Sequence, residues 1–215
     1  MRARRAANGP PFSDSASADM QLPGGFLLTG GFVEAKQTLI EDAVAIARQV
    51  TRLAHEIVEK NGGAGEVVLI GIRTRGEPLA ERLQSLITGH TGHDIQLGAL
   101  DITFHRDDFR ERLVVPQIEG THIDFSLDDK IVVLVDDVLY TGRTVRSAME
   151  ALMAFGRPKK IQLAVLVDRG HRELPIKADY VGKNIPTNEG EHVNVMLKEV
   201  DGKDAIVLMS YKEES

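Results

Sequence analysis

A strand that ends in two carboxylates and a glycine- and hydroxyl-rich loop constrains the fold of this chain more than any other stretch. Ile131–Val135 are five consecutive apolar residues, four of them β-branched, which is typical of a strand buried on both faces of a parallel sheet. Asp136 and Asp137 follow directly, and apolar residues recur at helical spacing from Val145 onward. The sequence therefore predicts an α/β protein in which an acidic pair and a loop lie at the carboxyl end of a sheet strand, where a helix begins.

The loop carries the donors that a phosphate requires. Backbone N–H groups at the start of the helix, the hydroxyls of Thr141 and Thr144 and the charge of Arg143 all suit a phosphate. Asp136 and Asp137 would repel that phosphate, and they suit vicinal hydroxyls or a divalent cation in the same ligand. A ligand that carries a phosphate near two vicinal hydroxyls would match these groups, and ribose 5-phosphate is such a ligand.

Two common nucleotide-binding motifs are absent from the sequence. It contains no G-x-x-x-x-G-K-[ST], which excludes a P-loop, and no G-x-G-x-x-G after a strand, which excludes the usual dinucleotide site. The alternative is a buried strand that ends in a solvated Asp pair before an ordinary helix cap. That alternative does not account for the complete arrangement of strand, acids, loop and helix.

The composition is that of a single globular domain. A chain of 215 residues is long enough for one good core and too short for two comfortable domains, and its 42% hydrophobic and 27% charged residues are ordinary values. The formal net charge of −6 argues against a protein coated in nucleic acid, but it leaves room for one basic face. The lack of cysteine excludes disulfides, thiolate catalysis and cysteine-ligated zinc, and it fits a cytoplasmic protein. No apolar run approaches the roughly 18 residues that a membrane span needs.

The pattern along the chain predicts a disordered extension at residues 1–31 and one domain at 32–215. The basic residues Met1–Arg5 are not followed by an apolar segment, which excludes a secretory signal. A helix is predicted from Thr38 to Asn61, a second helix has Pro78 near its first turn, and β-branched runs predict strands. The predicted strands lie at 67–70, 95–104, 161–167, 193–197 and 205–209, and the expected buried stripe of the first helix consists of Ile40, Ala43, Ala47, Val50, Ala54 and Ile57.

The stretch from Val132 to Thr144 resembles the phosphoribosyl-pyrophosphate (PRPP) binding motif of the type I phosphoribosyltransferases. More narrowly, Asp-Asp-Val-Leu-Tyr-Thr-Gly-Arg-Thr is similar to the motif of the pyrimidine operon regulators that are also uracil phosphoribosyltransferases, and the similarity runs from about Thr38 to the C-terminus. The resemblance implies a central, mainly parallel sheet flanked by helices, with a flexible lid loop and a small C-terminal hood. The residues it assigns to PRPP are Val132, Val133, Leu134, Val135, Asp136, Asp137, Val138, Leu139, Tyr140, Thr141, Gly142, Arg143 and Thr144.

The resemblance assigns the pyrophosphate end of PRPP to a second loop. Arg73, Thr74, Arg75 and Gly76 follow the strand at 67–70 and stand at the start of a helix, which is a second anion site. Alone, Arg-Thr-Arg-Gly is a weak signal. Beside the first loop it becomes a strong one, because PRPP carries phosphate at both ends. In the family this loop commonly contains a non-proline cis peptide.

The segment from His105 to about Leu127 is dense in charge and irregular, which is typical of a solvated loop. So long a connection inside a compact domain is usually functional or mobile. In the family the matching segment is a lid that closes over PRPP and excludes water, and its basic residues here are Arg106, Arg110 and Arg112.

Tyr180 and Val181 match the base-stacking pair of the wider family. One aromatic residue and one valine at a strand end are more often core packing, so packing remains an alternative for both.

An RNA-binding surface is also implied by the resemblance. Thr51 and His55 match positions on the RNA-binding surface of the regulators, and solvation is the alternative for this polar helix face. The most basic stretch of the chain adds Arg143, Arg146 and Lys159 as candidates, together with Arg157 and Lys160. The expected arrangement is a basic face that spans a homodimer, or a higher homo-oligomer, and that binds the leader mRNA of the pyrimidine (pyr) operon.

The reaction implied by the resemblance is uracil plus PRPP giving UMP and pyrophosphate. Asp136 and Asp137 would hold the ribose diol. They would also hold Mg²⁺, directly or indirectly, which by the resemblance would bridge the pyrophosphate and the ribose hydroxyls and neutralise the leaving group. Arg73 and Arg75 would stabilise the charge on the departing pyrophosphate. Tyr140 stands where purine-specific members often carry an acid as general base, which favours uracil as the substrate.

Two alternatives stay open at this point. The chain could be a purine-type phosphoribosyltransferase, or an RNA regulator with vestigial catalysis that senses UMP or UTP and PRPP. No membrane partner is expected.

Overall fold

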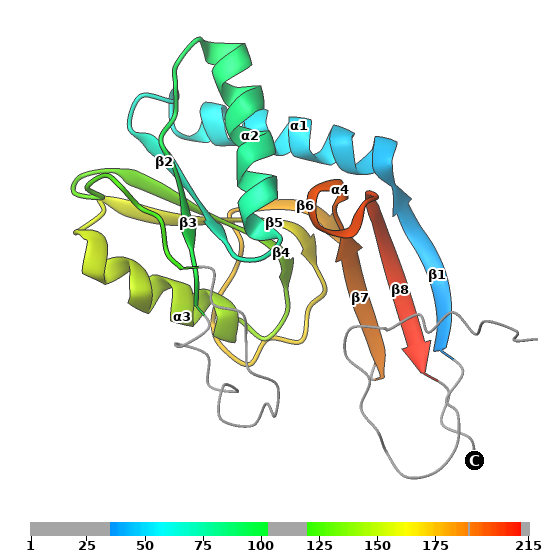
Figure 1. The fold of residues 1–215 in the computed structure, drawn as a ribbon. Coiled ribbons are helices and arrows are strands. Elements are labelled where there is room, and N and C mark those ends of the chain that lie inside the picture. Colours follow the sequence, from blue (N-terminus) through cyan, green and yellow to red (C-terminus); the bar gives the residue numbers. More distant parts are fainter. Residues whose placement is uncertain (1–34, 103–119, 189, 212–215) are drawn as a thin grey trace, which may run out of the picture. The chain divides into compact units, whose positions relative to one another are not determined.

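Five parallel strands form the sheet that carries the acidic pair. Their order is β3 (Leu97–Leu100), β2 (Val67–Ile72), β4 (Ile131–Leu139), β5 (Lys160–Asp168) and β6 (Tyr180–Asn184), and every neighbouring pair is parallel. The computed structural model describes residues 35–102, 120–188 and 190–211. Figure 1 shows β4 in the middle of this sheet. This arrangement confirms the α/β prediction and the expected parallel sheet.

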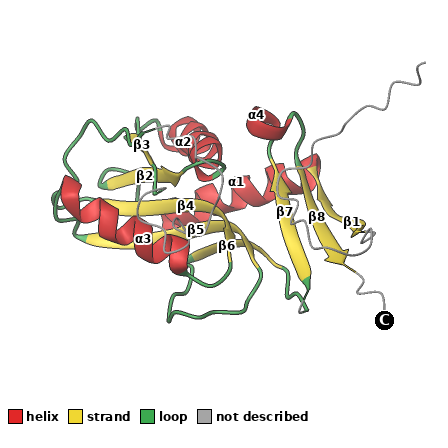
Figure 2. Ribbon diagram, turned by 60° about the horizontal axis from the view of Figure 1, so that its bottom comes forward, coloured by secondary structure: helices red, strands yellow, loops and turns green. Residues whose placement is uncertain are grey.

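Helices cover both faces of the sheet, as the uninterrupted apolar run of β4 requires. Val133 packs in one core cluster with the helices α1 (Ala43–Lys60) and α2 (Gly76–Thr91). Val132, whose side chain points the other way, packs in a second cluster with α3 (Arg143–Leu152). The ribbon in Figure 2 shows α3 on the opposite side of the sheet from α1 and α2.

The first helix begins later than its periodicity predicts. Asp42 has extended backbone, and its side chain accepts a hydrogen bond of 2.8 Å from the N–H of Ala45, so it caps the helix that starts at Ala43. Thr38, the expected start, lies instead in the strand β1 (Ala35–Asp42). The predicted helix from Thr38 was therefore wrong in its first turn, because a strand pairing distant in sequence overrides local helical spacing.

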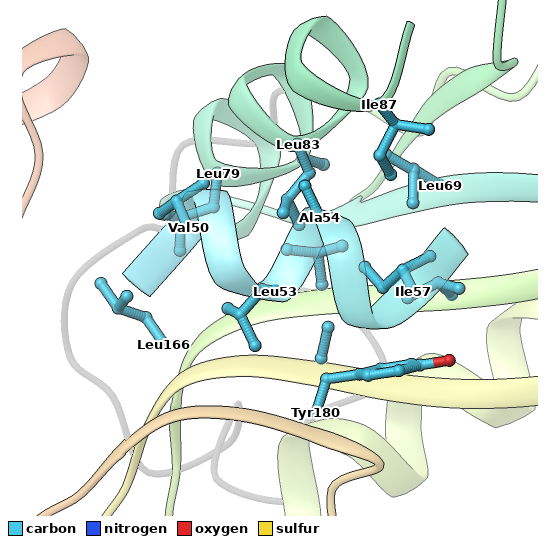
Figure 3. Packing of buried hydrophobic residues seen from close by; sticks show 14 of the residues in the cluster. Val50, Leu53, Ala54, Ile57, Leu69, Leu79, Leu83, Ile87, Leu166 and Tyr180 are labelled. Carbon is cyan, nitrogen blue, oxygen red and sulfur yellow. The ribbon is translucent and has the colours of Figure 1, made fainter. Parts of the chain in front are cut away.

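The buried face of α1 is correspondingly turned from the expected one. Ala43 and Ala47, both expected to be buried, are exposed, and Ile40 lies before the helix in β1. The buried residues are Ile46, Val50, Leu53, Ala54 and Ile57, and Figure 3 shows most of them meeting α2 and the sheet.

A second, antiparallel sheet has the order β1-β8-β7, with β7 (Glu191–Met196) and β8 (Ala205–Tyr211). These three strands and the whole segment between β7 and β8, which contains the short helix α4 (Lys198–Asp201) and Asp204, are called the hood below. The hood was expected from the C-terminal part alone. The structure corrects this, because β1 pairs with β8 from Ala35 to Asp42, whereas β6 belongs to the main sheet.

The remaining expectations concern the strand and lid before β4, the N-terminal extension and membrane spans. Of the strand predicted at 95–104, the structure describes residues 95–102, and among these Leu97–Leu100 form the strand that pairs with β2. The predicted lid arginines Arg106, Arg110 and Arg112, and the predicted extension at residues 1–31, lie outside the described residues. Within the described ranges, no helix is long and apolar enough to cross a membrane.

Candidate functional site

The acidic pair lies in the last part of β4. Asp136 is 6% exposed, and its Oδ1 accepts a hydrogen bond of 3.0 Å from the N–H of Asp137. Oδ1 of Asp137 in turn accepts one of 2.9 Å from the N–H of Val138. Burial raises the pKa of Asp137, while the positive charge of Arg75 and these hydrogen bonds act against the rise. The pair is thus held by its own backbone at the carboxyl edge of the sheet, with Arg75 within electrostatic reach.

The loop predicted to bind phosphate, Tyr140–Thr144, is called the phosphate loop below and joins β4 to the first residues of α3. Gly142 is the residue before the helix and has a φ of +93°, a conformation that favours glycine. A Cβ on Gly142 would lie 3.3 Å from the side chain of Ile176, so the loop also passes close to its neighbour. The N–H of Arg143 donates to Oγ1 of Thr141 at 3.3 Å. The helix start that the sequence predicts at this loop is confirmed, and the N–H groups of its first turn point out of the helix toward the loop.

The junction between β4 and the phosphate loop is held by Arg172, a residue that sequence reasoning missed. Its guanidinium donates to the carbonyl oxygen of Tyr140 at 2.7 Å and to that of Gly170 at 3.0 Å, and it pairs with the carboxylate of Asp168. Together with further contacts to the carbonyl oxygens of Leu139 and Ile176, these bonds fix the position where β4 ends. The only local signal was the charged and glycine-rich stretch after β5, which gives no indication of the carbonyls it faces.

The pyrophosphate loop, Arg73–Gly76, lies beside the acidic pair. The Arg73–Thr74 peptide is cis, as the family resemblance implied. Arg73 is paired with Glu77 at 3.2 Å. A Cβ on Gly76 would lie 2.3 Å from the carbonyl oxygen of Val135, the residue before the pair, so the start of α2 touches β4 directly. The structure therefore brings the two predicted anion loops together around Asp136 and Asp137.

Two arginines of this region are bound to the hood. Nε and Nη2 of Arg75 donate to the two carboxylate oxygens of Asp201 in α4, at 3.1 and 2.8 Å. Arg82 of α2 donates to both Glu199 and Asp204. These carboxylates were not singled out from the sequence, because nothing local indicates which arginines they meet.

Tyr140, the residue at the position of the purine-family acid, is 42% exposed. The guanidinium carbon of Arg169 lies 3.9 Å from the ring centroid, a cation–π distance, and the ring of His171 meets Tyr140 edge-on at 6.1 Å. Arg169 is itself buried and donates to the carbonyl oxygen of Glu191 in β7. Contacts with Arg169 and His171 thus hold the exposed Tyr140 in a defined position.

The prediction that Tyr180 stacks on the base is contradicted by its position. Tyr180 is 2% exposed, and Figure 3 shows its ring in the core next to Leu53 and Ile57 of α1. Its hydroxyl lies 3.0 Å from Nδ2 of Asn61 and donates to Gln162 at 3.1 Å. A ring enclosed by core side chains cannot contact a substrate, so the packing alternative is correct.

Val181, the other expected base contact, is half-buried and packs against the apolar cluster on the α3 side. Its carbonyl oxygen accepts a hydrogen bond of 2.9 Å from Arg52. It alternates with Tyr180 along β6, so the two side chains point to opposite faces of the sheet and cannot form one stacking pair.

The expected RNA-binding residues do not form one surface in a single chain. Thr51 and His55 lie on α1, whereas Arg143 and Arg146 lie on α3, which covers the other face of the sheet. Lys159 precedes β5, at the amino edge of the sheet. Each of the three basic residues has an acidic partner, namely Glu173 for Arg143, Glu150 for Arg146 and Glu66 for Lys159.

The donor set of the site suits magnesium only as a companion of the substrate. Among the described residues, no group of three or more His, Asp or Glu side chains is arranged to hold a metal ion. Mg²⁺ bound mainly by substrate phosphates and water needs only one or two carboxylates from the protein. Asp136 and Asp137 supply those, so the residues fit a magnesium ion that binds together with pyrophosphate.

The comparison with protein-family models agrees with this geometry. The model of the phosphoribosyl transferase domain matches residues 36–199. The solved hypoxanthine phosphoribosyltransferase of Trypanosoma cruzi superposes with a TM-score of 0.61 at 18% identity, over 81% of this chain and 97% of that one. A second one, from Staphylococcus aureus, gives a TM-score of 0.57 at 21% identity, over 81% of this chain and 93% of that one. These structures show the fold.

Curated relatives are much more similar in sequence. The bifunctional protein PyrR of Pelotomaculum thermopropionicum is 56% identical over 174 residues, which are 81% of this chain and 96% of that protein. The bifunctional protein PyrR of Deinococcus deserti is 54% identical over 181 residues, 84% of this chain and 99% of that protein. The chain therefore belongs to the phosphoribosyl transferase domain family and, within it, to the PyrR proteins.

Proposed function

We propose that this chain is a uracil phosphoribosyltransferase that forms UMP and pyrophosphate from uracil and PRPP, and that it also regulates the pyr operon by binding its leader mRNA. The observation that carries the enzymatic part is the placement of Asp136 and Asp137 between two anion loops. The phosphate loop begins at Tyr140, where β4 ends shortly after the pair, and the pyrophosphate loop touches β4 at Val135. A ligand with phosphate at both ends of a ribose matches this order of groups.

Asp136 and Asp137 orient the ribose in this proposal. Their carboxylates accept hydrogen bonds from the two ring hydroxyls, while the N–H groups at the start of α3 and the hydroxyls of Thr141 and Thr144 bind the 5-phosphate. Fixing the sugar at both points directs C1 toward the base and lowers the entropic part of the barrier.

The pyrophosphate loop binds the leaving group. As the bond between C1 and pyrophosphate breaks, negative charge grows on the departing oxygen, and the guanidinium groups of Arg73 and Arg75 stabilise that charge. Bound Mg²⁺ supplies further neutralisation of the pyrophosphate. Asp136 is 6% exposed and Asp137 is half-buried, so charges at the pair are partly shielded from water and interact more strongly than in bulk solvent.

Tyr140 supports uracil over a purine as the acceptor. A phenol is a poor base at neutral pH, so a purine would lack a proton acceptor at this position. The ring of Tyr140 is moreover fixed by Arg169 at 3.9 Å.

A steady-state assay of UMP formation from PRPP, uracil and magnesium tests the enzymatic proposal. Wild type should form UMP, Asp137→Asn should lose at least about 100-fold in kcat/KM because the ribose loses an oriented acceptor, and the exposed Asp94→Asn should match wild type. Turnover of hypoxanthine or guanine in place of uracil would favour the purine alternative. No UMP from wild type that still binds UMP would favour an RNA regulator with vestigial catalysis.

The regulatory proposal concerns α1. Its outer face carries the exposed His55 and, one turn away, Thr51, whose hydroxyl donates to the carbonyl oxygen of Ala47 at 2.9 Å. Neither residue belongs to the phosphate loop or to the pyrophosphate loop. In one chain, the patch on α1 and the basic residues of α3 lie on opposite sides of the sheet. In a dimer, the patches of the two copies would combine into one continuous RNA-binding face. A uridine nucleotide favours RNA binding only if it binds the RNA-competent state better.

Charge reversal at His55 separates the two activities. His55→Glu should weaken binding of an in vitro transcript of the pyr leader at least about 10-fold in a filter-binding assay with UMP, since a phosphate contact becomes a repulsion. UMP formation should be unchanged. His93→Glu, at another exposed histidine, is the matched control. Equal RNA binding by the His55 variant and wild type would refute the assignment of this face.

A further inference from the structure

The contact between Arg75 and Asp201 joins the pyrophosphate loop to the hood. Nε of Arg75 donates to Oδ2 of Asp201 at 3.1 Å and Nη2 to Oδ1 at 2.8 Å, which is a bidentate, charge-assisted pair. The side chains are 29% and 20% exposed, so the pair is largely shielded from solvent. The mutual hydrogen bonds raise the pKa of Arg75 and lower that of Asp201.

Asp201 is itself held firmly. Its Oδ2 also accepts a hydrogen bond of 2.9 Å from the N–H of Leu197, the residue before α4, and its own N–H donates to the carbonyl oxygen of Leu197 at 2.6 Å. Leu197 is completely buried. The carboxylate is therefore a fixed acceptor, and the guanidinium that binds it takes one defined orientation.

Arg75 has donors that Asp201 does not occupy. An arginine carries five N–H groups in a planar fork, and Asp201 occupies the side formed by Nε and Nη2. Nη1 makes no hydrogen bond to any residue in the ranges 35–102, 120–188 and 190–211. The carboxylate of Asp137 also interacts electrostatically with Arg75, so the guanidinium lies within Coulombic reach of the acidic pair as well as in contact with Asp201.

A neighbouring arginine shows what a purely structural contact looks like. Arg82 donates from Nε, Nη1 and Nη2, to Glu199 and Asp204, so all three of its nitrogens are occupied by the hood. Both arginines thus bind the same segment between β7 and β8. Arg82 is fully engaged there, whereas Arg75 keeps donors for a ligand.

We propose that Asp201 is a positioning residue for the pyrophosphate site, which holds Arg75 in the orientation that binds the pyrophosphate group of PRPP. This inference rests on the proposed phosphoribosyltransferase function. Without Asp201, Arg75 must lose the freedom of its long side chain when PRPP binds, and the lost entropy weakens binding. With Asp201 in place, that freedom is already lost in the free protein.

Three variants test the role by steady-state kinetics. Asp201→Asn keeps the size of the side chain but removes its charge, and it should raise the KM for PRPP about 10-fold with a smaller change in kcat and in the KM for uracil. Asp204→Asn removes a carboxylate of the same hood segment that does not touch Arg75, and its KM for PRPP should stay within about 2-fold of wild type. In an Arg75→Ala background, Asp201→Asn should have no additional effect.

Three results would each overturn the proposal: an unchanged or lower KM for PRPP in Asp201→Asn, an equal rise in Asp204→Asn, or effects of Asp201→Asn and Arg75→Ala that simply add. A lower KM would mean that Asp201 competes with pyrophosphate for Arg75. Partial recovery in Asp201→Glu would support the charge as the operative feature.

Direct binding of PRPP by isothermal titration calorimetry separates this inference from the proposed enzymatic function. If wild type forms no UMP but binds PRPP more tightly than Asp201→Asn does, the transferase proposal fails and the positioning role stands. If wild type forms UMP and both proteins bind PRPP equally, the positioning role alone fails.

Discussion

Gly76 and Val135 touch so closely that a side chain does not fit between them. A Cβ on Gly76 would lie 2.3 Å from the carbonyl oxygen of Val135 and 3.3 Å from Cα of Asp136. The backbone of the pyrophosphate loop thus rests on the backbone of β4, directly before the acidic pair. This contact sets the spacing between the groups proposed to bind the two ends of PRPP.

Substitution at this contact should disturb both the fold and the reaction. Gly76→Ala should lower the free energy of unfolding by about 2 kcal/mol through overpacking and lower kcat/KM for PRPP by about 100-fold through displacement of the loop. Urea denaturation and UMP formation measure the two effects. Gly89→Ala is the control. Gly89 lies in the same helix as Gly76, but a Cβ there would have no atom within 4 Å. It should stabilise α2 by up to about 1 kcal/mol.

Gly142 offers a test of the phosphate loop. Gly142→Ala combines an unfavourable φ of +93° with a contact of 3.3 Å to Ile176, so it should shift the start of α3 and raise the KM for PRPP about 10-fold. Gly92→Ala has the same kind of conformation, with a φ of +71°, but open space around it. It should cost about 1 kcal/mol of stability and leave the KM for PRPP unchanged. Equal KM values in the two variants would contradict a special role of the loop geometry.

The clamp between Arg82 and the hood predicts a pH dependence of stability. Hydrogen bonds from Arg82 lower the pKa of Glu199. Burial alone would raise the pKa of Asp204, but hydrogen bonds from Arg82 and from the N–H of Lys198 lower it overall. Both carboxylates therefore stabilise the folded chain above their ordinary pKa values of 4.5 and 3.8, and this contribution is lost as the pH falls through the lower values in the folded state.

Arg82→Gln should accordingly destabilise the protein near neutral pH and much less below pH 4. We expect about 1–2 kcal/mol at pH 7, less than for a fully buried pair because Glu199 is 41% exposed. Urea denaturation of both proteins from pH 3 to 8 measures the difference. A difference that stays constant over this range would contradict the assignment to the two carboxylates.

The raised pKa of Asp137 predicts that its contribution to folding stability depends on pH in the direction opposite to that of Glu199 and Asp204. Because burial raises its pKa in the folded state, its ionisation destabilises the fold, and stability falls as the pH rises from the ordinary value of 3.8 through the raised one. Asp137→Asn should therefore be more stable than wild type at pH 7, by about 1 kcal/mol as is common for relief of a buried active-site charge. The gain should vanish at low pH. An Asn variant that is inactive and also less stable at pH 7 would show that the charge of Asp137 is needed for the fold.

The core of the site was predictable from the sequence because its signals are continuous. The apolar run Ile131–Val135, the acids and the loop follow one another directly, so β4, the loop and the start of α3 could be placed from local pattern alone. The pyrophosphate loop was recognisable for the same reason. The spatial approach of the two loops follows from the parallel pairing of β2 with β4.

What escaped prediction depends on partners that are distant in sequence. Tyr180 matched a base-stacking position, but its burial is set by the register of β6, in which Tyr180 pairs with Ala164 of β5. The helix predicted from Thr38 failed because β8 recruits that segment into a strand. Asp42 was a local signal for the true helix start that helical periodicity alone did not take into account.

The pairing of β1 with β8 also has a consequence for biosynthesis. The ribosome makes Ala35–Asp42 early and their partners, Ala205–Tyr211, late, so β1 waits unpaired during most of translation. The main sheet can assemble from consecutive β–α units in that interval, but the hood sheet cannot. Asp201 is synthesised in the same late segment, so Arg75 stays without this partner until then. A nascent chain that already contains the acidic pair and both loops would therefore gain its full affinity for PRPP only when the last strand has emerged.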